Sequence, residues 1–99
     1  MQRRLVLRGQ AVAEFEETIK RYEADRDGLG QGFRAIIEHY FGKIANNPEL
    51  FRTIGGDVRC LVFSRRFPCV IHFRIEPNQI DILSVFHTSR DRNRLKFRK

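Results

Sequence analysis

Two histidines and three arginines have side chains of the types that a metal-free ribonuclease needs. Cleavage of a phosphodiester needs a base for the 2′-hydroxyl proton, cations for the phosphorane charge and an acid for the leaving oxygen. Residues of these types are His87, Arg90, Arg74, Arg59 and His72. The alternative interpretation is that the arginines form a solvated basic surface and that His87 is a polar residue at a strand end.

Other chemistries are not supported by the spacing of the residues. No GxGxxG or GxxxxGK phosphate loop occurs, and no Ser-His-Asp or Cys-His spacing indicates covalent catalysis. His39, His72 and His87 do not stand at metal-ligand spacing with the two cysteines. We therefore expect neither a metal nor a cofactor.

The two cysteines are expected to be unpaired. If Ser64 pairs with Cys69 across a hairpin, Cys60 lies opposite Phe73, and the sulfurs stand roughly 13 Å apart at ~3.3 Å per residue. A disulfide needs Cα atoms within about 7 Å. Both cysteines are therefore interpreted as small buried residues in a reducing cytoplasm.

The elements that must position these residues form an α+β domain over residues 1–99. Apolar residues recur with helical spacing in two segments, separated by Gly28 and Gly30 and ended by Pro48. Alternating apolar residues then predict three strands, after a loop at 49–56. The order is β-α-α-β-β-β with a basic tail: strand 3–8, helices 12–22 and 29–44, strands 57–64, 69–76 and 80–87, and a short helix at 89–97.

A helical hairpin of this size covers only one face of a small, mainly antiparallel sheet. The face expected under the helices holds Cys60, Val62, Ile71, Phe73, Ile82 and Phe86. The other face is then apolar with a basic rim, which is typical of a partner site. Its residues are Leu61, Phe63, Val70, Leu83 and Val85, with Arg59, His72, Arg74 and His87. The alternative is that the C-terminal tail folds back over this face.

Charge is the strongest bias in the composition. Nineteen Lys and Arg against twelve Asp and Glu give +7, which implies a polyanionic partner. Residues 9–56 hold six basic and eight acidic residues, so we expect the strands and the tail to carry the basic surface. No apolar run of about 18 residues and no secretory signal occurs, so we expect a cytoplasmic protein.

The order of several short motifs resembles the ParE-type toxins of the RelE/ParE toxin–antitoxin superfamily. The resemblance runs from Arg3 to about Leu95. Its residues are Tyr22-Glu23, Gly28-Leu29-Gly30, Phe33, Ile44, Asn47-Pro48, Gly55, Val58-Arg59, Arg66-Phe67-Pro68, Phe73-Arg74, Val85-Phe86-His87 and Arg90-Asp91.

This resemblance implies a single toxin domain, a helical hairpin packed on a small antiparallel sheet, and a plasmid-stabilisation-like function. It implies a cognate antitoxin whose C-terminal segment wraps the toxin, in a hetero-oligomer. For the ParE branch it implies inhibition of DNA gyrase. For the RelE branch it implies cleavage of messenger RNA on the ribosome.

The ribonuclease branch of the family carries an arginine early in the third strand, and Val70 holds that place here. An apolar residue cannot stabilise a phosphorane, so the ParE branch is favoured. A degenerate toxin that only binds its antitoxin is a third interpretation. The expected target-binding residues are Arg59, Arg74, His87, Arg90, Arg92 and Arg94. For antitoxin binding they are Leu61, Phe63, Val70, His72, Leu83 and Val85, and for a ribonuclease His87, Arg74 and Arg90.

Overall fold

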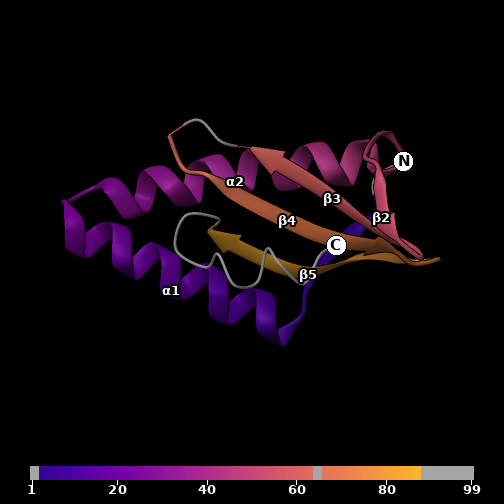
Figure 1. Cartoon of the computed structure of the whole chain (residues 1–99), viewed down its shortest axis with the longest axis horizontal. Coiled ribbons are helices and arrows are strands. Elements are labelled where there is room, and N and C mark those ends of the chain that lie inside the picture. The colour runs from indigo at the N-terminus through magenta and orange to yellow at the C-terminus, as the bar shows by residue number, and fades with distance from the viewer. Residues whose placement is uncertain (1–2, 64–65, 88–99) are drawn as a thin grey trace.

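Two long helices lie beside a five-stranded sheet in a computed structural model that describes residues 3–63 and 66–87 (Figure 1). The elements are β1 (Arg4–Leu7), α1 (Gly9–Asp25), α2 (Leu29–Asn46), the 3-10 turn η1 (Pro48–Leu50), β2 (Thr53–Gly55), β3 (Val58–Phe63), β4 (Cys69–Ile75) and β5 (Gln79–His87). The predicted α+β class and the order of the six main elements are confirmed. The short helix expected at 89–97 lies outside the described residues.

The sheet has the strand order β1-β5-β4-β3-β2. β1 runs parallel to β5, and the other neighbours are antiparallel. The expectation of a structureless loop at 49–56 is wrong in part, because Thr53 and Gly55 pair with β3 as a short edge strand. Three residues are too few to show an alternating pattern, so the sequence did not reveal β2.

The connection between the two helices depends on two glycines. Gly28 has φ +87°, a left-handed conformation that side chains disfavour. The Glu23 carboxylate of α1 accepts the backbone N–H groups of Gly28 and Gly30 at 2.9 and 3.0 Å. It thereby satisfies donors at the start of α2 that have no partner within the helix. The two helices are therefore fastened to each other at the turn.

The main core lies between the helices and one face of the sheet. Phe33, Ile37 and Ile44 of α2 are fully buried there with Phe73 of β4 and Ile82 of β5. Aromatic rings make much of the contact, with Phe33 and Phe67 at 5.5 Å and Tyr22 and Phe67 at 4.8 Å between ring centroids. Offset and edge-on rings at such distances pack favourably. The apolar helix faces predicted from periodicity are largely the ones that are buried, except at Val12, which is 37% exposed at the start of α1, where Ala11 is buried instead.

The expected strand pairing of β3 with β4 is wrong by one residue. Cys69 pairs with Phe63 rather than Ser64, so Cys60 lies opposite His72 instead of Phe73. A shift of one residue exchanges the two faces of a strand. Leu61 therefore lies in the helix-side core, whereas Cys60 lies on the opposite face.

A β-bulge in β5 exchanges the two faces of the strand a second time, for the residues that follow it. Phe73 pairs with Ile82 and His72 with Ser84, so Leu83 is an extra residue between the two pairs. The alternation changes phase there, and Val85 joins Ile82 in the helix-side core. We call the sheet face turned away from the helices the outer face. It carries Cys60, Val62, Val70, His72 and Phe86.

Candidate functional site

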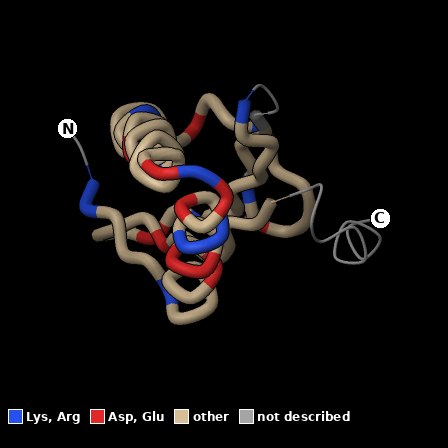
Figure 2. Tube along the Cα trace, turned by 90° about the vertical axis from the view of Figure 1, so that its left-hand side faces the viewer, with Lys and Arg blue, Asp and Glu red and all other residues tan. Residues whose placement is uncertain are grey.

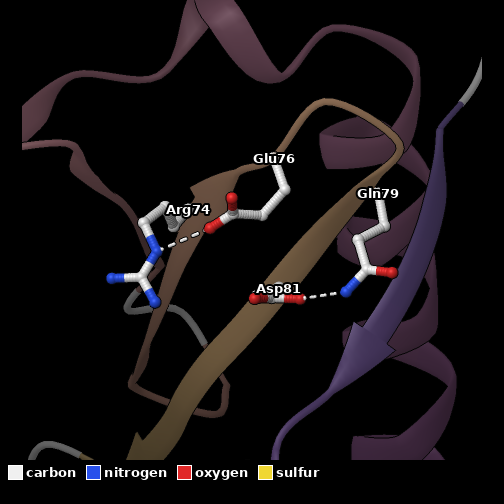
Figure 3. A network of polar contacts seen from close by, with 4 residues as sticks. All are labelled: Arg74, Glu76, Gln79 and Asp81. Atoms are coloured by element: carbon white, nitrogen blue, oxygen red, sulfur yellow. Dashed lines mark hydrogen bonds and ion pairs between the residues drawn. The ribbon is translucent and has the colours of Figure 1, made fainter.

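A polar network stands where β4 turns into β5 (Figure 3). Arg74 Nε donates to Glu76 Oε2 at 2.9 Å, and Gln79 Nε2 donates to Asp81 Oδ1 at 2.6 Å. Arg4 of β1 reaches Gln79 Oε1 at 3.5 Å. In Figure 3 the two terminal amino groups of Arg74 point away from the other three residues drawn. Glu76 therefore holds Arg74 through Nε alone. The two terminal amino groups of Arg74, which we call its outward fork, point away from both neighbouring acidic residues, Glu76 and Asp81.

His87 lies on the helix side of the sheet, at the end of β5. Its Nε2 shares a hydrogen bond with the hydroxyl of Tyr22 on α1. The Tyr22 ring also packs edge-on against Phe67. The expectation that His87 faces the outer surface is wrong, because the bulge at Leu83 reverses the alternation of β5. His87 therefore joins the strand end to the first helix.

The structure does not bring His87 and Arg74 together. His87 pairs with Cys69 at the start of β4, and Arg74 stands five residues further along that strand. This separates them by about 16 Å at ~3.3 Å per residue. His87 is also buried against α1. The structure therefore does not form one site from this pair, and the third residue of the expected ribonuclease set, Arg90, lies outside the described residues.

Arg59 fastens the segment that precedes it in the chain. Its Nη1 donates to the carbonyl oxygen of Phe51 at 2.6 Å and lies 3.4 Å from that of Glu49. These two carbonyls belong to η1 and to the residue just after it. Charged donors to backbone carbonyls make strong hydrogen bonds. Arg59 therefore holds the connection from η1 to β2 against the sheet.

The residues expected to contact an antitoxin are divided between the two faces. Leu61 and Val85 lie in the helix-side core, so the face predicted for them is wrong. Val70 and His72 lie on the outer face but are each only 5% exposed. Leu83 is half-buried at the bulge, and the side chain of Phe63 lies outside the described part. Val62, which was expected under the helices, is instead 58% exposed.

Acidic and basic residues are nearly balanced over residues 3–63 and 66–87, and they are interspersed along the chain (Figure 2). This part holds twelve Lys and Arg against eleven Asp and Glu. The expectation of basic strands is therefore wrong for β3 to β5, because Arg59, Arg66 and Arg74 are matched by Asp57, Glu76 and Asp81. It holds around β1, where Arg3, Arg4 and Arg8 have no acidic neighbour in the sequence. Most of the +7 belongs to residues 88–99, including Arg90, Arg92 and Arg94, which lie outside the described residues.

The two cysteines are both free and buried, on opposite faces of the sheet. Burial raises the pKa of the Cys69 thiol to about 12, although a backbone hydrogen bond at Val70 acts in the opposite direction.

Within the described part of the chain, no group of three or more His, Cys, Asp or Glu residues could hold a metal ion.

A surface hollow that the sequence did not predict lies at the C-terminal end of α2. It has a volume of about 380 Å³, and its lining residues are Lys43, Asn46, Asn47, Leu50 and Phe51. Leu50 is 79% exposed beside it. The sequence signal was the apolar pair Leu50-Phe51, two residues after Pro48, which is too weak to indicate a site. None of the helices in the described ranges is long and apolar enough to cross a membrane.

A protein-family model and a solved structure are both similar to this chain. A family model described as the ParE toxin of the type II toxin–antitoxin system parDE matches residues 5–92. Among solved structures, one titled a chromosomal ParDE TA system from P. aeruginosa has a TM-score of 0.61 and 15% sequence identity, over 87% of this chain and 96% of that chain. At that identity the likeness shows a shared fold. No curated protein matches the chain.

Proposed function

The chain belongs to the ParE toxin family of type II toxin–antitoxin systems, which implies a cognate antitoxin as its partner, and we propose that its target is DNA gyrase in the cytoplasm. The observation that carries this proposal is the family match over residues 5–92. A plasmid-stabilising role would follow from the same activity.

The distribution of charge supports a binding toxin rather than a ribonuclease. The described fold is nearly neutral, His87 is buried, and Arg74 stands five residues away from His87's partner Cys69 along β4. We propose that Arg90, Arg92 and Arg94 contact the target, together with the outward fork of Arg74. His87 and Arg59 act as positioning residues, because each is engaged in a contact that holds the fold.

Purified gyrase offers a direct test. The wild-type toxin is expected to inhibit DNA supercoiling, and the triple variant Arg90→Ala/Arg92→Ala/Arg94→Ala is expected to inhibit about tenfold to a hundredfold less, since each lost cation weakens a charged interface. The matched control is Arg21→Ala/Arg34→Ala, which removes two helix-surface arginines that pair with Glu17 and Glu38. Equal inhibition by the triple variant and the wild type would refute the assigned contacts.

Induction in cells separates gyrase from the ribosome as the target. Inhibition of gyrase is expected to activate the DNA-damage response and to leave messenger RNA intact. Rapid cleavage of transcripts in translating cells, with unchanged DNA supercoiling, would contradict the proposal and would indicate a RelE-type ribonuclease. Antitoxin binding without any effect on either would indicate a degenerate toxin.

For the antitoxin we propose contact at the outer edge of β3, around Val62. β2 pairs only with the first part of β3, through Thr53 and Gly55, and Val62 beyond it is 58% exposed. Val62→Glu is expected to weaken antitoxin binding in calorimetry. The matched control is Val12→Glu on α1, because Val12 is also an exposed valine, at 37%. Equal affinities for the two variants would contradict this contact.

A further inference from the structure

The surface hollow at the C-terminal end of α2 combines three kinds of side chain. Its lining has one cation, Lys43, two amides, Asn46 and Asn47, and two apolar residues, Leu50 and Phe51. An amide side chain both donates and accepts hydrogen bonds, as the backbone of a bound peptide also does. The volume of about 380 Å³ is near the lower end of the range for ligand sites, roughly 300–1,000 Å³. The hollow therefore suits one or two residues of a partner chain.

Contacts with the sheet and the core hold the wall that η1 and Phe51 form. The Phe51 ring packs edge-on against Phe73 of β4, with 5.8 Å between the ring centroids. Arg59 of β3 donates to the Phe51 carbonyl oxygen at 2.6 Å, and the Leu50 N–H donates to the Asn47 carbonyl oxygen at 3.2 Å. A site whose walls are already ordered binds a partner at a lower entropic cost. The hollow is therefore preformed.

Leu50 leaves an apolar surface in water beside the hollow. It is 79% exposed, the largest exposed fraction among the large apolar side chains that are described. Single exposed leucines are common on protein surfaces, but this one stands on a fixed wall next to a space that a side chain can enter. An apolar side chain placed there contacts Leu50 and Phe51 together, and removal of this area from water favours binding.

The charge at the hollow indicates an acidic partner. Lys43 is exposed, and no carboxylate in residues 3–63 and 66–87 lies within ion-pair distance of its ammonium group. A nucleic acid fits poorly, because its phosphates require a series of cations and the described lining holds Lys43 alone. A peptide with a carboxylate beside an apolar side chain matches both parts of the hollow. The net charge of +7 favours the approach of such a segment.

We propose that an acidic segment of the cognate antitoxin occupies this hollow, with an apolar side chain against Leu50 and Phe51 and a carboxylate at Lys43. Arg59, which holds the wall, and Val62 lie three residues apart on β3, about 10 Å at ~3.3 Å per residue. One extended segment can therefore reach both the hollow and the contact proposed at Val62. This inference rests on the proposed antitoxin partner and not on gyrase as the target.

Calorimetry with the purified antitoxin and the full-length toxin tests the apolar part of the contact. Leu50→Ser is expected to bind about tenfold more weakly than the wild type, because it removes apolar area from the interface. The matched control is Val12→Ser, which changes another exposed apolar residue, on α1, and is expected to bind as the wild type. Both side chains are exposed, so the fold is expected to remain intact, which thermal unfolding verifies.

A charge reversal tests the ionic part of the contact. Lys43→Glu is expected to bind about tenfold more weakly, since it places like charges together. Lys20→Glu makes the same change of net charge at an exposed lysine of α1, so it controls for long-range attraction between the two proteins. The difference between the two variants then measures the local contact at the hollow.

A thiol at position 50 locates the bound segment directly. Leu50→Cys adds an exposed thiol to a chain whose own cysteines, Cys60 and Cys69, are both buried. With saturating antitoxin, alkylation at position 50 is expected to be about tenfold slower or more, because a thiol must be accessible to react. Val12→Cys is expected to react at the same rate with and without antitoxin.

Three results would overturn the proposal while the antitoxin still binds the wild-type toxin. The first is equal affinity within either matched pair, Leu50→Ser with Val12→Ser or Lys43→Glu with Lys20→Glu. The second is a Leu50→Cys thiol that stays fully reactive in the complex. The third is protection of that thiol in the toxin alone, increasing with toxin concentration, which would assign the hollow to a second copy of the chain. A wild-type toxin that binds no antitoxin would refute the antitoxin partner itself, and this inference with it.

Discussion

Gly30 of α2 lies close against α1, and replacing it with alanine tests how the hairpin is built. A Cβ at this position would stand 2.7 Å from the carbonyl oxygen of Ile19 and 2.9 Å from Glu23 Oε1. The first of these atoms is backbone and cannot move by a rotamer change. The second belongs to the carboxylate that accepts the N–H groups of Gly28 and Gly30.

The size of the effect follows from two opposing terms. Alanine in a helix is favoured over glycine by up to about 1 kcal/mol. Against this, overpacking costs about 1–3 kcal/mol, and disturbing hydrogen bonds to a charged group costs about 1.5–3 kcal/mol. The two costs overlap rather than add, because a Glu23 carboxylate that moves away relieves its part of the overpacking. We therefore expect Gly30→Ala to lower the free energy of unfolding by about 1–3 kcal/mol. For a domain of this size, that corresponds to a fall in Tm of roughly 5–20 °C.

Gly42 provides the matched control, because it lies in the same helix and a Cβ there meets nothing within 4 Å. Gly42→Ala is expected to raise the free energy of unfolding by about 0.5–1 kcal/mol. Thermal and urea unfolding followed by circular dichroism measures both variants. A Gly30→Ala protein as stable as Gly42→Ala would refute the close approach of the helices.

Three further predictions concern single contacts. Glu14 Oε1 accepts Ser84 Oγ and the Val85 N–H, both at 2.9 Å, so Glu14→Ala is expected to cost about 1–3 kcal/mol in urea unfolding; Glu14→Gln keeps an acceptor and should cost less, and equal costs would contradict this account. Arg59→Ala is expected to speed hydrogen exchange in β2 while leaving β5 unchanged, because it removes the donor to Phe51; unchanged exchange in β2 would argue against the role given to Arg59. Since burial raises the pKa of Cys69 to about 12, its alkylation at pH 9 should be roughly a hundredfold or more slower in the folded chain than in urea, and comparable rates would show that the thiol is accessible.

The elements of this fold were predictable because their signals are long or strongly periodic. Both helices repeat apolar residues over several turns, and Pro48 marks the end of the second. The three long strands alternate clearly. β2 was missed because it spans only three residues, two of which pair with β3.

The assignment of faces could not be predicted with the same success. Alternation gives the period of a strand but not its phase relative to its neighbours. One residue of error in the pairing of Cys69, and one extra residue at Leu83, exchanged the positions of Leu61, Val85 and His87. The candidate site changed accordingly, because a histidine expected at the surface is a buried partner of Tyr22. The position of a bulge depends on how two strands pair in the assembled sheet, so the local sequence pattern around Leu83 did not predict this one.

The parallel pairing of β1 with β5 joins the first and the last strands of the described chain, with Arg4 beside Gln79 and Leu7 beside Ile82. Contacts between such distant segments require the closure of a long loop, which costs conformational entropy and slows folding. While the ribosome is still adding β4, β1 lacks its pairing partner β5, and both helices lack the part of the core that β5 supplies. A product of interrupted translation that stops before β5 cannot complete the sheet, because β5 pairs with both β1 and β4. We therefore expect a partly made chain to stay unfolded until its last strand is synthesised.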